Sequence, residues 1–168
     1  MQGKGVKRDP KGPFSCPRFF ASQVHPMMTA FYLIASFSNA LLLGGMVLFS
    51  FVIAPLVFIQ LPTDIAGRFI RAIFPWYYLY VITTAAVTAL TLAPSLVSEP
   101  LAMGGVALAG LYTRQILMPE INRLRDAQLA GDKPAGAAFA FRHRLSVVIN
   151  FLQLFTAAAV LVSLHLAA

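Results

Sequence analysis

Four polar side chains near the C-terminus recur at intervals of three, four and three residues, and they are His143, Ser146, Asn150 and Gln153. These intervals place all four on one face of an α-helix. Their neighbours are mostly apolar, and an unpaired amide in hydrocarbon is costly, so we expect this polar stripe to face other helices. The chemistry on offer is hydrogen bonding, either between helices or to a small solute that enters past His143.

A second polar set lies in the first long apolar stretch, where Ser36 and Asn39 are three residues apart and Ser50 follows on the same side. If the first and last stretches form antiparallel helices, Asn39 and Gln153 lie at comparable depth near the middle of the bilayer. We therefore expect a hydrogen bond between Asn39 and Gln153. Together the two sets predict a polar cluster inside the membrane, composed of Asn39, His143, Ser146, Asn150 and Gln153.

The sequence shows no arrangement typical of an enzyme. It holds no nucleophile motif, no glycine-rich phosphate loop after a strand and no carboxylate pair suited to acid–base chemistry. No Asp or Glu lies inside the apolar core, which argues against a carboxylate proton relay or an ion-driven pump. We therefore expect a non-enzymatic protein.

Soft metal ligands gather on one expected side of the membrane. Cys16, His25 and His165 would share that side, with Met27 and Met28 near, and such ligands suit copper. Their spacing does not match that of paired metal ligands. We therefore expect no metal site.

The polar residues are carried by stretches long enough to cross a bilayer. The 38 residues from Pro26 to Thr63 contain no Asp, Glu, Lys or Arg, whereas one span needs only about 20 apolar residues. Composition agrees, because 58% of the 168 residues are hydrophobic and only 11% are charged. The sequence thus predicts an all-α integral membrane protein, a four-transmembrane-helix bundle with spans at about 28–60, 75–93, 101–118 and 145–165.

Local signals predict the shape of these spans. A helix over residues 28–60 would run roughly 50 Å, so it must tilt, protrude or bend, and Pro55 is the expected bend point. Apolar residues repeat at helical spacing between positions 65 and 73, which predicts a short amphipathic helix in the membrane interface after the first span. Arg114 interrupts the third span and could snorkel toward the headgroups. Residues 131–138 are expected to form a loop.

Two groups of residues are expected at helix surfaces. Glycines let a neighbouring helix approach closely, and the candidates are Gly44, Gly45, Gly104 and Gly105. Basic and aromatic residues favour the headgroup level, and the candidates are Arg68, Arg71, Trp76, Tyr77 and Arg114. These residues predict where helices meet one another and where they meet the lipid headgroups.

The net charge of +7 has a membrane explanation, since the basic residues flank apolar spans, where they set orientation and meet anionic lipid. We expect no nucleic-acid partner. A basic tail rich in Gly and Pro covers residues 1–27, before the transmembrane domain at 28–168. The first and third connections hold eight basic residues against five on the side of the termini, so both termini are expected outside. A bacterial cytoplasmic membrane is the expected location, with the mitochondrial inner membrane as the alternative.

Several motifs occur in a fixed order between about residues 28 and 162. They are Gly44-Gly45-Met46, Phe51, Phe58, Leu61-Pro62, Gly67, Phe74-Pro75 with Tyr77, Met118-Pro119, and His143-x-Leu145-Ser146 with Asn150. This set resembles the transmembrane protein 205-like family, largely described as a domain of unknown function. The resemblance implies a four-helix membrane protein without an established biochemical activity, a eukaryotic member being linked to drug resistance. It marks Gly45, Pro62, Gly67, Pro75, His143, Ser146 and Asn150.

The first span, with its Gly-Gly-Met sequence and Pro55, is more distantly similar to copper-resistance D-type membrane proteins and HemJ-type protoporphyrinogen oxidases. That resemblance implies a histidine within the first helix. This sequence has Phe31 and Tyr32 in the equivalent region. We therefore expect neither haem nor copper as a cofactor.

Three functions follow from these observations. The first is a scaffold or accessory subunit of a larger membrane assembly, with a membrane-protein partner or as a homo-oligomer. The second is a resistance-associated transporter or binding protein for a small solute or metal that uses the polar residues inside the membrane. Its path would be lined by Asn39, Arg114, His143, Asn150 and Gln153. The third, from distant resemblance alone, is a haem-linked oxidoreductase.

Overall fold

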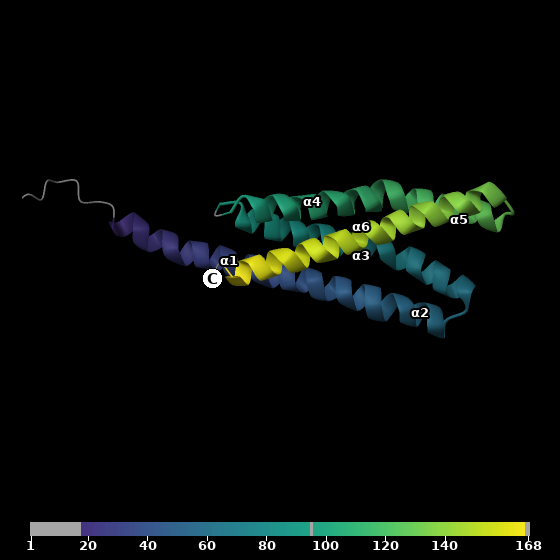
Figure 1. Cartoon of the computed structure of the whole chain (residues 1–168). Helices are drawn as coiled ribbons and strands as arrows, with labels where there is room; N and C mark the ends of the chain where they lie inside the picture. The colour runs from purple at the N-terminus through teal and green to yellow at the C-terminus, as the bar shows by residue number, and fades with distance from the viewer. Residues whose placement is uncertain (1–17, 95, 167–168) are drawn as a thin grey trace, which may run out of the picture.

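The computed structural model describes residues 18–94 and 96–166, and within these ranges all regular structure is helical (Figure 1). The elements, in chain order, are α1 (Arg18–Leu48), the π-helical segment η1 (Phe49–Ile53), α2 (Ala54–Gln60), α3 (Thr63–Leu92), α4 (Ser98–Tyr112), the π-helical segment η2 (Thr113–Leu117), α5 (Met118–Leu129) and α6 (Lys133–Leu166). Because η1 and η2 continue the helices on either side, the chain forms four long helices. All four are long and apolar enough to cross a membrane.

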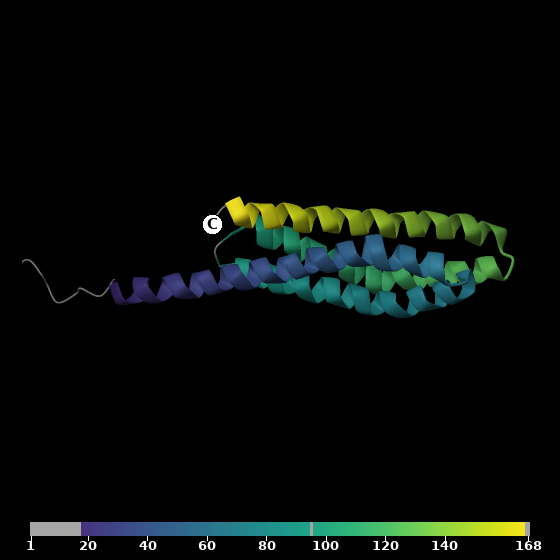
Figure 2. The same ribbon diagram turned by 90° about the horizontal axis from the view of Figure 1, so that it is seen from below.

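The four helices run antiparallel in a single bundle (Figures 1 and 2). α3 packs against α1 and α4, and α6 packs against the same two helices. The first hairpin therefore consists of α1, η1, α2 and α3, and the second of α4, η2, α5 and α6. Both tight connections, at Leu61–Pro62 and at Ala130–Asp132, lie at the same end of the bundle. We call these two ends of the hairpins the tips.

Side-chain burial agrees with a lipid environment. The core between the helices contains fully buried apolar residues such as Leu42, Val81 and Met103. Large apolar side chains also cover the outside of the bundle, where Leu90 is 73% exposed and Phe37 is 69% exposed. Contiguous exposed apolar surface of this extent is stable in hydrocarbon rather than in water. The fold is an all-α four-helix bundle of an integral membrane protein.

Each π-helical segment is followed by a proline two residues after its end, Pro55 in the first hairpin and Pro119 in the second. A proline ring in a helix clashes with the carbonyl four residues earlier and removes one hydrogen bond. The wider turn moves that carbonyl aside, and bonds five residues long replace the usual ones, from Ala54 N–H to the Phe49 oxygen and from Met118 N–H to the Thr113 oxygen. The interruption expected at Pro55 is thus a π-helical segment just before it.

The helices are longer than the sequence patterns predicted. The prediction of a separate interfacial helix is wrong, because α3 runs unbroken from Thr63 through Pro75 to Leu92. Its first turns pack partly on the bundle, because Ala66 is buried and Ile70 lies against the core, whereas Ile65 and Phe69 are exposed. Only part of the apolar stripe therefore has a protein partner. Most of the expected loop over residues 131–138 belongs to α6.

Two local devices explain the second tip. Gly131 has a φ of +97°, a conformation that glycine adopts without strain, and it ends α5. The Asp132 carboxylate accepts a hydrogen bond of 3.2 Å from the Ala135 N–H and so caps α6. Residues 1–17 of the expected tail lie outside the described residues, and residues 18–27 are part of α1, which extends beyond the bundle at the end opposite the tips (Figure 1).

Candidate functional site

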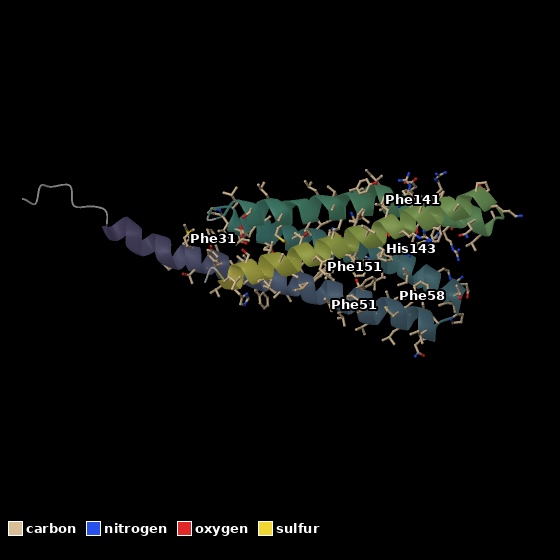
Figure 3. All side chains as sticks on the ribbon, viewed as in Figure 1. Phe31, Phe51, Phe58, Phe141, His143 and Phe151 are labelled. Atoms are coloured by element: carbon tan, nitrogen blue, oxygen red, sulfur yellow. The ribbon has the colours of Figure 1, made fainter. Side chains whose placement is uncertain are left out.

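A cavity of about 700 Å³ lies between the two tips. In Figure 1 the tip formed by α2 and the start of α3 stands apart from the tip formed by α5 and α6. Figure 3 shows Phe58 on α2 and His143 on α6 at this end of the bundle. Its apolar lining includes Phe58, Ile70, Phe74, Met118, Ile121, Leu129 and Phe139. Its polar lining includes Asp64, Arg68, Arg71, Asn122, Arg125, Asp126, His143 and Ser146. We call it the tip cavity, and its size suits a small organic ligand.

Ion pairs fix two arginines of the tip cavity. Arg71 on α3 donates through Nη1 and Nη2 to the two carboxylate oxygens of Asp126 on α5, at 3.1 and 2.9 Å. Arg68 donates to Asp64 one turn earlier on the same helix, at 3.4 Å. The first pair joins the two hairpins, whereas the second pair is local to α3. Both carboxylates of the cavity are thus matched by arginines.

Arg125 is held by neutral groups. Its Nη1 donates to Gln128 Oε1 at 2.8 Å, and its guanidinium carbon lies 5.4 Å from the centre of the Phe139 ring. That distance is within the range of a cation–π contact. The His143 ring stacks on the same Phe139, with centroids 5.8 Å apart and planes at 11°. An arginine and a histidine of the tip cavity therefore share one aromatic platform.

A hydrogen-bonded layer lies directly below the tip cavity. The Tyr77 hydroxyl donates to Asn150 Oδ1 at 2.6 Å, and Asn150 Nδ2 donates to Ser50 Oγ at 3.0 Å. Phe49 stacks on the Tyr77 ring at 4.3 Å between centroids and meets Phe74, a cavity residue, edge to face at 5.4 Å. Because Ser50 belongs to η1, the π-helical segment places its hydroxyl toward α6. Through Phe74, which contacts both Phe49 and Tyr77, this layer adjoins the wall of the cavity.

Deeper in the bundle, amide side chains bind backbone carbonyls. Asn39 Nδ2 donates to the Ala157 oxygen and Gln153 Nε2 to the Val106 oxygen, both at 2.9 Å. The predicted hydrogen bond between Asn39 and Gln153 is therefore wrong. Each amide reaches a carbonyl of the helix facing it, and Asn39 Oδ1 and Gln153 Oε1 have no hydrogen-bond partner.

The polar stripe follows α6 from the cavity into the bundle. His143 and Ser146 line the tip cavity, Asn150 joins the layer below it, and Gln153 reaches α4. The Ser146 hydroxyl is occupied locally, since it donates to the His143 oxygen at 2.7 Å. Asn39 does not join the other four residues, because its partner is on a deeper turn of α6.

The predicted packing glycines differ in their surroundings. A Cβ on Gly45 would lie 2.5–2.7 Å from atoms of the Tyr80 ring, so α1 and α3 approach closely there. A Cβ on Gly44, Gly104 or Gly105 would meet nothing within 4 Å. Sequence reasoning missed Gly110, where a Cβ would lie 3.0 Å from Ile82. The available signal was the helical spacing that Gly110 shares with the buried residues Met103 and Val106.

The residues predicted at the membrane interface also differ in their surroundings. Trp76 is 71% exposed on the outside of the bundle. Tyr77, its neighbour, is only 7% exposed and lies in the core, contrary to the expectation of a headgroup position. Arg114, in η2, donates through Nε to the Pro75 oxygen at 3.1 Å, so it ties the second hairpin to α3.

A second, smaller hollow of about 350 Å³ lies on the outside, between α4 and α6. Small residues line its α4 side, namely Ala102, Gly105 and Ala109, and Gln153 and Thr156 line its α6 side. We call it the α4–α6 groove. Small residues in this arrangement allow close approach of a further helix.

Among the residues that the structure describes, no group of three or more His, Cys, Asp or Glu side chains could hold a metal ion. Cys16 of the expected copper ligands lies outside the described residues.

Fold and site define the class as a four-helix integral membrane protein with a ligand-sized cavity between its hairpin tips. The chain belongs to the family described as Domain of unknown function (DUF4149), which matches residues 37–129. The match covers the chain from within α1 to the end of α5, so the polar stripe of α6 lies beyond it. No curated protein and no solved structure matches the chain.

Sequence reasoning missed most of the cavity walls. Arg125 and Asp126 lie between the third and fourth predicted spans, and Phe139 lies between the expected loop over residues 131–138 and the fourth span. For Phe139 the available sequence signal is its interval of four from His143, which puts the Phe139 ring on the same face of the helix as the polar stripe.

Proposed function

We propose that this chain is a small, non-enzymatic membrane protein that binds an amphiphilic molecule in the tip cavity. The observation that carries the proposal is the composition of the cavity, in which apolar walls such as Phe58 and Phe74 meet a polar set at the same end. Ligand sites commonly combine an apolar lining with a few convergent polar groups. An amphiphile presents both kinds of surface at once.

The position of the cavity supports this choice. The tips carry most of the basic residues of the connections, and basic residues concentrate at the cytoplasmic surface of membrane proteins. We propose that the tips lie on the cytoplasmic side of a bacterial inner membrane, with both termini outside. An amphiphile with its polar end at the headgroups would then meet the cavity at the depth at which it already resides.

A glycine pair gives a sharp test. Gly67 lines the tip cavity, and a Cβ there would meet nothing within 4 Å, so Gly67→Phe adds a ring to the cavity without a backbone clash. Gly44 has the same open surroundings but lies far from the cavity, so Gly44→Phe is the matched control. The protein in nanodiscs would be labelled with a hexadecyl probe that carries a diazirine, and the labelled peptides mapped by mass spectrometry.

We expect labelling of cavity residues in the wild type and in Gly44→Phe, with a clear loss in Gly67→Phe. Equal cavity labelling in both variants, or labelling spread over the outside of the bundle, would contradict the proposal. A haem-linked activity would be revealed by a visible absorption band of the purified protein.

The α4–α6 groove favours a second candidate function, that of a scaffold or accessory subunit. Gly105 leaves open space on the outside of α4, and the neighbouring small residues would admit a helix of another protein. This function predicts a stoichiometric partner, or a second copy, after purification from native membranes in mild detergent. Gly105→Phe should release the partner and Gly67→Phe should retain it, and a lone protein in all three samples would contradict the scaffold function.

A further inference from the structure

We infer that the ligand of the tip cavity carries an acidic head group, a carboxylate or a phosphate, on an apolar tail. This inference rests on the proposed function and names the chemical class of its ligand.

The charges around the cavity leave one arginine over. Among the described residues that line it, three are arginines and two are aspartates. Asp126 is engaged by Arg71 and Asp64 by Arg68. Arg125 contacts only the neutral Gln128 and the Phe139 ring. An uncompensated guanidinium at a partly buried site is unfavourable, and an anionic ligand would compensate it.

The structure also orients Arg125 toward the cavity. Gln128, which accepts its hydrogen bond, lies against α6 at Gly136, where a Cβ would stand 3.1 Å from Gln128 Nε2. Gly136 therefore leaves the room in which Gln128 sits. The guanidinium has five N–H donors and gives one to Gln128, so it keeps donors for a carboxylate or phosphate.

Further donors surround the same position. Asn122 lies three residues before Arg125, on the same face of α5, and also lines the cavity. His143, whose ring stacks on the same Phe139, lines the cavity from α6. Phe74, Ile70 and Met118 form the apolar wall on the way to the buried layer. The head group is thus placed at the tips and the tail toward the core.

Ligands with one tail and different heads test the inference. Wild-type protein in nanodiscs of zwitterionic lipid, carrying the hexadecyl diazirine probe, would be challenged with palmitic acid, hexadecyl phosphate, hexadecanol and hexadecyltrimethylammonium. Inorganic phosphate would test the head alone. We expect both acids to displace the probe at concentrations about tenfold or more below those of the alcohol, because hydrogen bonds to charged groups are stronger than those between neutral groups. Phosphate alone should compete weakly.

Arg125→Gln removes the charge and should reduce acid binding to the level of the alcohol, while alcohol binding stays unchanged. Arg123→Gln is the matched control, since Arg123 is exposed on the same helix and does not line the cavity. Gly136→Ala tests the positioning of Arg125, and it should lower the acid preference by less than Arg125→Gln does.

The outcomes separate the two proposals. If no hexadecyl compound displaces the probe from cavity residues, the proposed function itself fails. If acid, alcohol and ammonium compete equally, or if Arg125→Gln leaves the acid preference intact, the cavity binds amphiphiles and the acidic head group is wrong. Stronger competition by the ammonium compound would also overturn the inference.

Discussion

Arg71 and Asp126 form a two-pronged ion pair that connects the two hairpins at their tips. The two terminal guanidinium nitrogens of Arg71 each donate to a different carboxylate oxygen of Asp126, at 3.1 and 2.9 Å. Of the three ion pairs in the described part of the chain, only this one joins the hairpins, since Arg68–Asp64 is within α3 and Arg142–Glu120 joins α6 to α5. It therefore bridges the two walls of the cavity.

Loss of this ion pair should widen the tips. We expect Asp126→Asn to lengthen and broaden the distance between spin labels at Thr63 and Leu129, measured by double electron–electron resonance in a Cys16→Ser background. The charge swap Arg71→Asp with Asp126→Arg should restore the narrow distribution, because paired geometry rather than one charge holds the tips. Arg68→Gln is the control, since its partner is on its own helix. A distribution that does not change in Asp126→Asn would show that other contacts hold the tips.

Tyr77→Phe should destabilise the bundle by about 1–2 kcal/mol, because it removes the donor to Asn150 Oδ1 and leaves that oxygen unpaired between helices. The measurement is the free energy of unfolding by steric trapping in bicelles. Thr83→Val is the comparison, since the Thr83 hydroxyl bonds only within its own helix and is exposed. Equal effects of the two substitutions would mean that the layer below the cavity adds no stability.

The contact between Gly45 and Tyr80 should appear as a non-additive pair. Gly45→Ala should cost about 1–3 kcal/mol, because the Tyr80 ring must move and its hydroxyl loses the Leu41 oxygen. Gly44→Ala should be neutral or stabilising by up to about 1 kcal/mol, since alanine favours a helix and has room here.

The test of this contact is a double-mutant cycle. In a Tyr80→Ala background, the obstacle is gone, and Gly45→Ala should no longer destabilise the protein. If the cost of Gly45→Ala is the same in both backgrounds, the close approach of α1 and α3 does not depend on this pair.

Asp132→Ala should destabilise the protein by about 1 kcal/mol, because the first turn of α6 loses its side-chain cap at the Ala135 N–H. Asp132→Asn should be close to neutral, since asparagine is an equally good capping residue. Unfolding free energies of the two variants decide the matter. A loss in Asp132→Asn as large as in Asp132→Ala would assign the effect to charge and not to capping.

The sequence was sufficient to predict the four helices and the inward polar stripe. Long uncharged stretches leave no other structure possible in a bilayer, and the spacing of His143, Ser146, Asn150 and Gln153 determines a common face. The partners of that stripe could not be predicted, because they depend on the rotation and depth of each helix. Asn39 and Gln153 were expected to bond to each other, yet each donates to a backbone carbonyl. Every residue has such a carbonyl, so residue types do not indicate which one accepts the bond.

The tip cavity was beyond prediction for a related reason. Pro75 and the arginines before it are typical of a break at the membrane surface. α3 nevertheless continues, with Ala66 and Ile70 packed on the bundle and Arg71 paired with Asp126 of α5. Trp76 and Tyr77 have similar membrane preferences, and tertiary contacts distinguish the buried ring from the exposed one, since Tyr77 stacks on Phe49 and donates to Asn150. Tertiary contacts thus decide what composition leaves open.

The lack of burial in α2 makes the two walls of the cavity mechanically unequal. None of its seven residues is buried, whereas α5 buries Met118 and Ile121. A segment with so few buried contacts opens at low free energy, so a ligand would pass sideways from the lipid past α2 while α5 stays fixed. Backbone amides of α2 should therefore exchange hydrogen faster than those of α5, and equal protection would argue for a route from water. Faster exchange in α2 than in α5 would mean that the proposed ligand enters the tip cavity laterally, from the lipid.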